Sequence, residues 1–316
     1  MQFINQAETT AALKWDDLVG ALRDMFIKGC DMPVRHHHDM IVPGETNATM
    51  LLMPAWVRGE YIGVKLVNVF PDNAKRGLPA ISGNYVLSSG ATGEMLAVID
   101  GGELTARRTA AASALASRYL SRKQSSKLLV VGSGRLSTCL AQAHSSQRPI
   151  DEVQIWGRDL AKASAVADGL NKLGYNAVPC ENLEDGVKKA DIISCATLSQ
   201  KPLIDGRWLK EGAHLDLVGG FRATMREADD NAIKRASVFV DTKGGCLDAG
   251  EFCPGDIKDP IESGLLNSAD VVDLYQLTRG DHAGRRNDSE ITMFKSVGAA
   301  LEDLAGAILA YKTCSK

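Results

Sequence analysis

The chain has 316 residues, 45% of them hydrophobic, which is enough for two domains that each bury a core. Its formal net charge of −3 and pI near 6.1 argue against a nucleic-acid partner. No apolar run approaches the ~20 residues that span a membrane, and the N-terminus lacks the pattern of a signal peptide. Seven scattered cysteines without a Cys-x-x-Cys motif predict reduced thiols in a cytoplasmic protein, and neither disulfides nor zinc.

The first hundred residues predict a mostly antiparallel sheet. A short strand and an amphipathic helix that could begin at Thr10 come first, within residues 1–28. Three apolar, strand-like runs follow, "ATMLLMPAWV", "YIGVKLVNVF" and "ISGNYVLSSGATGEMLAVID". The last contains "SSGATG", which fits a hairpin turn. An alanine-rich helix over about 103–122 ends this part of the chain.

From residue 127 the pattern changes to strands that alternate with helices. The strand-like runs are "KLLVVG", "EVQIWG", "NAVPC", "DIISCAT", "AHLDLVGG" and "SVFVD". Helices between strands predict parallel pairing with right-handed crossovers. The final segment, "EITMFKSVGAALEDLAGAILAYK", predicts a strand and a long helix, and we expect that helix to pack against the first domain.

The fold class is therefore α/β, with two domains. We expect a Rossmann dinucleotide-binding domain with a parallel sheet at residues 113–290. A discontinuous α+β domain for substrate binding and dimerisation is expected at residues 1–112 and 291–316.

The stretch "KLLVVGSGRLS" has the form of a dinucleotide-binding loop. Gly132 can make the tight turn after the strand, and Gly134 allows the backbone to approach a pyrophosphate. The following helix offers unpaired N–H groups at its N-terminus. Ser137 replaces the third glycine of the common pattern, and it is small enough for helix–strand packing. The predicted loop contacts are Gly132, Ser133, Gly134, Arg135 and Leu136.

The end of the next predicted strand bears on the choice of cofactor. An acid that would bind a ribose 2′-hydroxyl is replaced there by Gly157 and Arg158, followed by Asp159. An arginine can pair with a 2′-phosphate, so we favour NADPH, with NADH still possible and a merely solvated Arg158 as the alternative. Asp159 is expected to cap the next helix. Further predicted cofactor contacts are Gly157, Arg158, Lys162, Thr197, Val218, Gly219 and Thr292.

Three cations in the first domain have distinctive surroundings: Arg35 in "MPVRHHHDM", Lys65 in "YIGVKLVNVFPDN" and Arg108 in "TARRTAAASALA". Lys65 interrupts an apolar strand, so a buried ammonium there needs an anionic partner, for which a substrate carboxylate would serve. The three neighbouring histidines, residues 36–38, alternate between the faces of a strand, which disfavours a shared metal ion. No metal site is predicted.

These segments together resemble the ornithine cyclodeaminase/μ-crystallin family over almost the whole chain. The segments are "MPVRHHH", "GVKLVNVFPDN", "GLPAISGNYVLSSGATGEMLAVIDG", "TARRTAAASALASRYL", "VVGSGRLS", "WGRDLAKA", "VGGFRATMREAD" and "EITMFKSVG". The resemblance implies a homodimer in which Arg35, Lys65 and Arg108 hold the substrate carboxylate. It also implies that residues 292–296, including Ser296, lie near the nicotinamide or the substrate.

Phe221 distinguishes between activities within the family. In the ornithine cyclodeaminases that this chain resembles, the corresponding sequence is "GGD", and its aspartate handles the substrate amine. This chain has "GGF" there, and a phenyl ring can neither accept a proton nor pair with an ammonium. The following residues 224–227 fit a helix capping box. The resemblance is strongest to the Δ1-pyrroline-2-carboxylate and Δ1-piperideine-2-carboxylate reductases, which implies reduction of a cyclic imino acid to L-proline or L-pipecolate, as in trans-3-hydroxy-L-proline degradation.

On this hypothesis Arg35, Lys65, Arg108, Phe221 and Ser296 contact the substrate, and Lys65 or a bound water or histidine protonates the imine nitrogen. Four alternatives stay open. Two are enzymatic, ornithine cyclodeamination and reductive amination of a 2-keto acid in the manner of alanine dehydrogenase. A third is a μ-crystallin-like protein that binds NADPH without turnover, and the fourth is synthesis of an unusual amino acid.

Overall fold

The computed structural model describes residues 1–248, 250 and 253–315. The chain forms two compact units, one of Met1–Arg108 and Ala300–Lys316 and the other of Thr109–Ala299. Residues 109–112 and 291–299 therefore belong to the second unit and not, as predicted, to the first. No helix among the described residues is long and apolar enough to cross a membrane, and all seven cysteines are free thiols.

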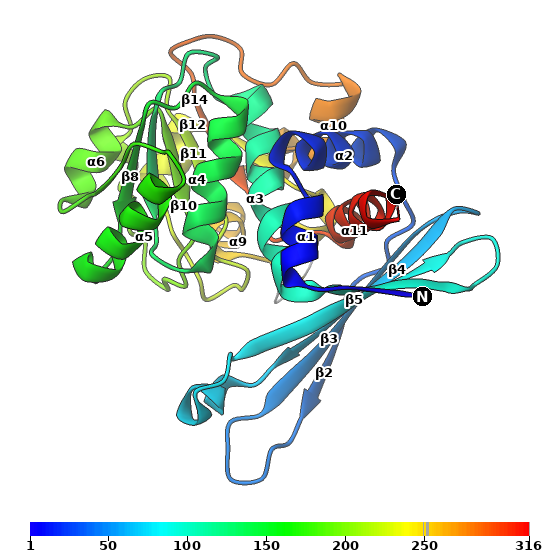
Figure 1. Ribbon diagram of the computed structural model, residues 1–316. Helices are drawn as coiled ribbons and strands as arrows, with labels where there is room; N and C mark the ends of the chain where they lie inside the picture. The colour runs from blue at the N-terminus through cyan, green and yellow to red at the C-terminus, as the bar shows by residue number, and fades with distance from the viewer. Residues whose placement is uncertain (249, 251–252, 316) are drawn as a thin grey trace. The chain divides into compact units, whose positions relative to one another are not determined.

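The first unit contains a six-stranded sheet in the order β1-β6-β5-β4-β3-β2. β1 pairs with β6 in parallel, and the other neighbours are antiparallel, as predicted. Figure 1 shows β2 to β5 as long neighbouring ribbons. The strands are β1 (Gln2–Ile4), β2 (His36–Met40), β3 (Ala48–Val57), β4 (Tyr61–Val69), β5 (Ile81–Ser89) and β6 (Met95–Asp100), with a 3-10 turn at Pro71–Arg76.

The helices of this unit are α1 (Gln6–Ala12), α2 (Trp15–Lys28), the first part of α3 (Gly101–Leu120) and α11 (Ala300–Cys314). α11 packs against α2, β3 and β4, as expected for a final helix that returns to the first domain. The prediction that a helix begins at Thr10 is wrong. Asn5 and Glu8 form a capping box that starts α1 earlier, and the Thr10 hydroxyl donates to the Gln6 carbonyl inside that helix.

The second unit contains an eight-stranded, fully parallel sheet in the order β13-β12-β14-β11-β10-β7-β8-β9. Its strands are β7 (Lys127–Val131), β8 (Glu152–Trp156), β9 (Ala177–Pro179), β10 (Ile192–Cys195), β11 (His214–Leu217), β12 (Ala236–Val240), β13 (Val272–Asp273) and β14 (Ile291–Lys295). Helices between them include α4 (Arg135–Gln147), α5 (Leu160–Lys172), α6 (Leu183–Lys189), α7 (Asp230–Arg235), α8 (Lys243–Cys246), α9 (Gly255–Glu262) and α10 (Leu274–Arg279), with short 3-10 turns at Gly206–Trp208 and Ser268–Asp270.

This strand order is that of a Rossmann fold for its first five members. From β7 the chain moves outward to β8 and β9, then returns to place β10 and β11 on the other side of β7. The sixth position is filled by β14, which is inserted between β11 and β12. In such sheets ligands bind outside the carboxyl ends of the strands, where the order reverses. That edge, beyond β7 and β10, is where a cofactor site is expected.

Candidate functional site

The loop after β7 has the geometry that a dinucleotide requires. Gly132 has φ of +134°, and a Cβ there would lie 2.8 Å from the Ala196 carbonyl oxygen, so a side chain is excluded. Gly134 is the N-cap of α4 and has no side-chain capping bond, while the space around its missing Cβ is open. The first N–H groups of α4 can therefore face an anion directly. The buried Ser137 donates its hydroxyl to the Gly132 carbonyl oxygen at 2.8 Å, which fixes the turn.

The end of β8 lies beside this loop. A Cβ on Gly157 would come within 2.8 Å of the Ser133 hydroxyl, so the two loops are packed closely. Arg158 is exposed, and Asp159 accepts hydrogen bonds from the backbone N–H groups of Ala161 and Lys162 and so caps α5, as predicted. The exposed Arg158 side chain has the solvent access that a cofactor 2′-phosphate needs.

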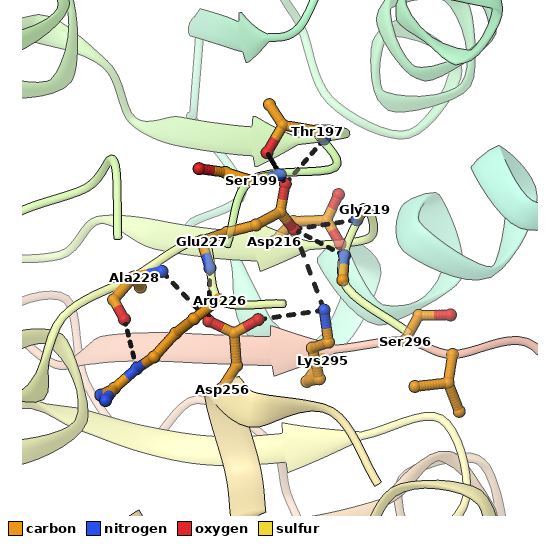
Figure 2. Close-up of polar contacts among 12 residues, drawn as sticks. Thr197, Ser199, Asp216, Gly219, Arg226, Glu227, Ala228, Asp256, Lys295 and Ser296 are labelled. Carbon is orange, nitrogen blue, oxygen red and sulfur yellow. Dashed lines mark hydrogen bonds and ion pairs between the residues drawn. The ribbon is translucent and has the colours of Figure 1, made fainter. Parts of the chain in front are cut away.

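A buried carboxylate joins the next two loops at the same edge (Figure 2). Glu227 Oε1 accepts from the Thr197 backbone N–H (2.7 Å) and hydroxyl (2.8 Å). Its Oε2 accepts from the N–H groups of Gly219 (2.8 Å) and Gly220 (3.3 Å). A Cβ on Gly219 would lie 1.9 Å from the Thr197 carbonyl oxygen, so only glycine permits this approach. Glu227 therefore ties the loop after β10 to the loop after β11.

Two further buried charges complete this cluster. Lys295, the last residue of β14, has its Nζ 3.3 Å from Asp256 Oδ2 and 3.8 Å from Glu227 Oε2. Asp256 Oδ1 accepts from the backbone N–H groups of Glu227 and Ala228. Burial raises the pKa of Glu227 to about 7, against the opposing effect of the Lys295 ammonium. Although burial lowers the pKa of Lys295, the charges of Asp256 and Glu227 outweigh it and the net shift is upward.

The predicted capping box at residues 224–227 is wrong. The following helix, α7, is capped by Asp229, whose side chain accepts from the Ala232 N–H. Glu227 instead turns into the interior, where it is fully buried. The spacing of Thr224 and Glu227 is typical of a helix cap, but the Glu227 carboxylate instead binds the loops at the carboxyl edge of the sheet.

The predicted contacts around β14 separate into two groups. Ser296 lies at the carboxyl end of the strand, where its hydroxyl donates to Asp241 Oδ2 at 3.0 Å. Thr292 lies near the amino end, is fully buried, and donates its hydroxyl to the Leu120 carbonyl oxygen at 2.8 Å. Thr292 thus lies near the opposite end of the strand from the edge at which dinucleotides bind, and the structure gives its predicted cofactor contact no support.

The other predicted contacts lie at that edge: Ser133, Arg135 and Leu136 after β7, Thr197 after β10, and Val218, Gly219 and Phe221 after β11. Phe221 is 37% exposed, and the guanidinium of Arg222 lies 5.8 Å from its ring centre. The phenyl ring of Phe221 is thus partly exposed in the loop after β11.

The first unit brings its predicted cations together around two acids of α11. The Lys65 ammonium is buried and lies 2.7 Å from Asp303 Oδ2. Arg108 donates from Nε to Asp303 Oδ1 (2.8 Å) and from Nη1 to Glu302 Oε2 (2.7 Å). Burial lowers the pKa of Lys65 to about 8; Asp303 opposes this shift, and the positive charges of Arg108 and Arg35 add to it. Arg35 is thus within electrostatic reach of Lys65.

Tyr85 packs beside this group on the same face of the sheet. It is the cross-strand partner of Lys65 and is fully buried. A Cβ on Gly63 would lie 1.9 Å from the Tyr85 hydroxyl, so the glycine makes room for the ring. Burial, followed by the charge of Asp303, raises the pKa of Tyr85 well above 10, and its hydroxyl keeps its proton.

The histidine run forms β2, and its side chains alternate as predicted. His36 and His38 share one face, with ring centres 6.3 Å apart and nearly perpendicular planes, while His37 lies on the other face.

Sequence reasoning missed Glu227, Asp256, Glu302 and Asp303. Glu302 and Asp303 could have been found from helical spacing, because they fall among apolar residues of a helix expected to be buried and therefore require cationic partners. Glu227 carried no such signal, since it lies in an irregular segment.

Comparison with known proteins places the chain among its relatives. An uncharacterized protein of Schizosaccharomyces pombe is 47% identical over 327 aligned positions, covering 100% of this chain and 98% of that protein. A Delta(1)-pyrroline-2-carboxylate reductase of Paracoccus denitrificans is 36% identical over 305, covering 96% and 94%. The solved structure of the Thermococcus litoralis Delta(1)-pyrroline-2-carboxylate reductase, in complex with NADH and L-proline, superposes with a TM-score of 0.91 at 30% identity, covering 100% and 98%. The sequence model of the ornithine cyclodeaminase/mu-crystallin family matches residues 3–316, and the chain belongs to that family.

Proposed function

We propose that this protein reduces cyclic imino acids with a nicotinamide cofactor, converting Δ1-pyrroline-2-carboxylate to L-proline and Δ1-piperideine-2-carboxylate to L-pipecolate. The observation that carries the proposal is the buried cluster of Lys65 and Arg108 with Asp303, in a chain whose other unit has a dinucleotide-binding edge. Relatives named as Delta(1)-pyrroline-2-carboxylate reductases support the same reaction.

The cluster offers cationic groups to a substrate carboxylate. Lys65 and Arg108 are buried and both contact Asp303, and the positive charge of Arg35 also acts on Lys65. A substrate carboxylate would form charge-assisted hydrogen bonds with these cations. Because both Lys65 and Arg108 are already held by carboxylates, little side-chain entropy is lost when they bind it.

The reaction needs a hydride at carbon and a proton at nitrogen. A nicotinamide cofactor held by the loop of Gly132 and Gly134 would supply the hydride to the imine carbon, and the nitrogen would then need a proton from the protein or from water. Lys65 is suited to provide the proton, because a group with a pKa of about 8 is protonated at neutral pH and releases its proton readily. A cyclic imine has no side-chain amine, so its reduction requires no acidic residue at position 221, where this chain has Phe221.

We propose NADPH as the preferred cofactor, with Arg158 binding the 2′-phosphate. Its support is that Arg158 is exposed and follows Gly157, which packs closely against Ser133 of the dinucleotide loop, where an acid for the ribose hydroxyl is absent. We also propose a cytoplasmic homodimer that serves the degradation of trans-3-hydroxy-L-proline.

The test is a spectrophotometric assay of purified protein with NADPH and NADH, each with the five- and six-membered imines, L-ornithine, and pyruvate plus ammonia. Oxidation of NADPH by the imines is expected. Ammonia release from ornithine without imine reduction would overturn the proposal. Tight NADPH binding with no turnover of any substrate would favour a binding protein instead.

A further inference from the structure

Six cationic side chains line one cavity of the nucleotide-binding unit, which has a volume of about 500 Å³. They come from three separate parts of the chain, the end of α3 and the segments that precede β8 and β14. The six are Arg118, Arg122, Lys123, Arg148, Arg285 and Arg286.

This cavity is distinct from the cofactor edge. Its lining segments lead into the amino ends of β7, β8 and β14, whereas the loops of Gly132 and Gly219 follow carboxyl ends. In a parallel sheet these are opposite edges, and a five-residue strand separates them by roughly 16 Å. A dinucleotide at the carboxyl edge therefore leaves the cavity open.

Two of the arginines have a structural role that explains their presence. Arg148 donates to the carbonyl oxygens of Ser117, Arg118 and Ser121. Arg285 donates to the Leu120 carbonyl oxygen. Both thus satisfy carbonyl groups at the C-terminal end of α3, where a helix favours positive charge.

The other four cations, Arg118, Arg122, Lys123 and Arg286, are not needed to bind the carbonyl groups at the end of α3. Arg122 pairs with Asp191 at 2.7 Å, and Arg286 pairs with Glu290 at 2.9 Å. Arg118 and Lys123 are exposed.

Asp288 is the carboxylate of the lining, while Asp191 and Glu290 hold Arg122 and Arg286, and Asp191 is also shared with Lys210. The lining therefore carries more positive than negative charge. Burial, and then the charge of Arg118, lowers the pKa of the half-buried Arg148. Burial lowers the pKa of Arg285 to about 10; Glu290 and Asp288 oppose this shift, and Arg122 and Arg148 add to it.

We propose that this cavity is a second ligand site, which binds a small polyanion with several phosphate or carboxylate oxygens while the cofactor is bound. An anion would relieve the mutual repulsion of the cations, and guanidinium groups favour paired oxygen atoms. The volume fits a ligand of metabolite size. The site is independent of the proposed imine reduction.

Isothermal titration of the protein saturated with NADPH, or with NADH if that binds better, tests the proposal. Pyrophosphate is the phosphate probe and citrate the carboxylate probe. At least one should bind, with an affinity that falls as salt rises. Lys123→Ala/Arg286→Ala should weaken binding roughly tenfold, because it removes two cations that can pair with the anion. Lys172→Ala, an exposed cation on α5, should leave binding unchanged.

The stronger of the two probes identifies the class of ligand. Arg118→Ala provides a second disruption from another element and should also weaken binding, and unchanged NADPH affinity in each variant confirms that the unit is folded. The proposal is overturned if neither probe binds at millimolar concentration. It is also overturned if the double variant binds as tightly as Lys172→Ala.

Discussion

Asp303 determines the state of the two cations that matter most in the first unit. Its Oδ2 forms an ion pair with the Lys65 ammonium, and its Oδ1 accepts a hydrogen bond from Arg108. The carboxylate raises the pKa of Lys65 against the larger effect of burial. It therefore both orients Lys65 and favours its protonated form.

Asp303→Asn should move the alkaline limb of the pH profile. With wild-type protein kcat/KM should fall as pH rises through about 8, because Lys65 loses the proton it donates. Removing the Asp303 charge lowers the pKa of Lys65 further, so the fall should begin at lower pH. Arg108, Arg35 and Tyr85 also face this group, and they stay protonated over that range. The measurement is kcat/KM for imine reduction from pH 6 to 10.

Glu302→Gln is the matched control for that experiment. Glu302 pairs with Arg108, which stays charged throughout, so this variant should raise KM without displacing the limb. A limb that is the same in both variants would rule out Lys65 as the titrating group.

Arg158→Ala should alter cofactor choice more than catalysis. Loss of a charge-assisted pair with a 2′-phosphate should raise the KM for NADPH by roughly tenfold to a hundredfold. The KM for NADH, which lacks that phosphate, should stay within a factor of about two. Steady-state assays with each cofactor give the comparison, and equal changes for both would refute the phosphate contact.

Glu227→Gln should weaken the cofactor edge. An amide offers one acceptor oxygen where the carboxylate offers two, and its NH₂ group would meet N–H donors of Gly219 and Gly220. A loss of about 2–4 kcal/mol in unfolding free energy is expected, together with weaker NADPH binding. Glu184→Gln, an exposed carboxylate on α6, should change neither. Denaturant unfolding and cofactor titration are the measurements.

At the scale of elements, the packing of β4 on β5 depends on a missing side chain. Gly63→Ala would place a methyl group inside the buried Tyr85 side chain and should lower unfolding free energy by about 1–3 kcal/mol. Gly20→Ala, within α2, meets nothing within 4 Å and should instead stabilise by about 0.5–1 kcal/mol. Thermal unfolding distinguishes them; equal stability of the two variants would contradict the close packing seen here.

Most elements could be predicted because their signals are local. β3 and the β5–β6 hairpin follow from apolar runs and turn residues, and the alternation from β7 to β12 follows from period and length. The Gly132 loop was found because its backbone conformation demands glycine. Helical spacing could have identified Asp303 as a buried acid but not its partner, and no local signal identified Glu227. Their partners, the Gly219 backbone and Lys65, come from distant parts of the sequence, and only the folded chain brings them together.

At the scale of the whole molecule, the two units differ in how their residues are distributed along the chain. The first is made of residues from both ends of the sequence, and the second is continuous. The sequence predicts that the final strand belongs to the first unit together with α11. In the structure β14 instead forms backbone hydrogen bonds with β11 and β12, so it belongs to the second unit. Strands that are neighbours in space need not be neighbours in sequence.

The proposed homodimer can be tested on the sheet of the first unit. Ile62 of β4 and Met95 of β6 both lie opposite Ser88 of β5, and they are 38% and 45% exposed. Exposed apolar side chains that share one face of a sheet favour association with a second copy. Sedimentation velocity should show a dimer, and Ile62→Lys should shift it towards monomer. Lys172→Ala should not, and a wild-type monomer at micromolar concentration would exclude the assembly.

The position of β14 also constrains the order in which the protein can form. This strand is translated after β12 and β13, yet it separates them from β11 in the finished sheet. Until it emerges from the ribosome, β12 has no neighbour on that side, and the first unit still lacks α11. Neither unit can complete its core during early synthesis, so both should mature late and together, with exposed strand edges in the meantime. Nascent chains stalled before residue 291 should therefore be good substrates for chaperones and proteases.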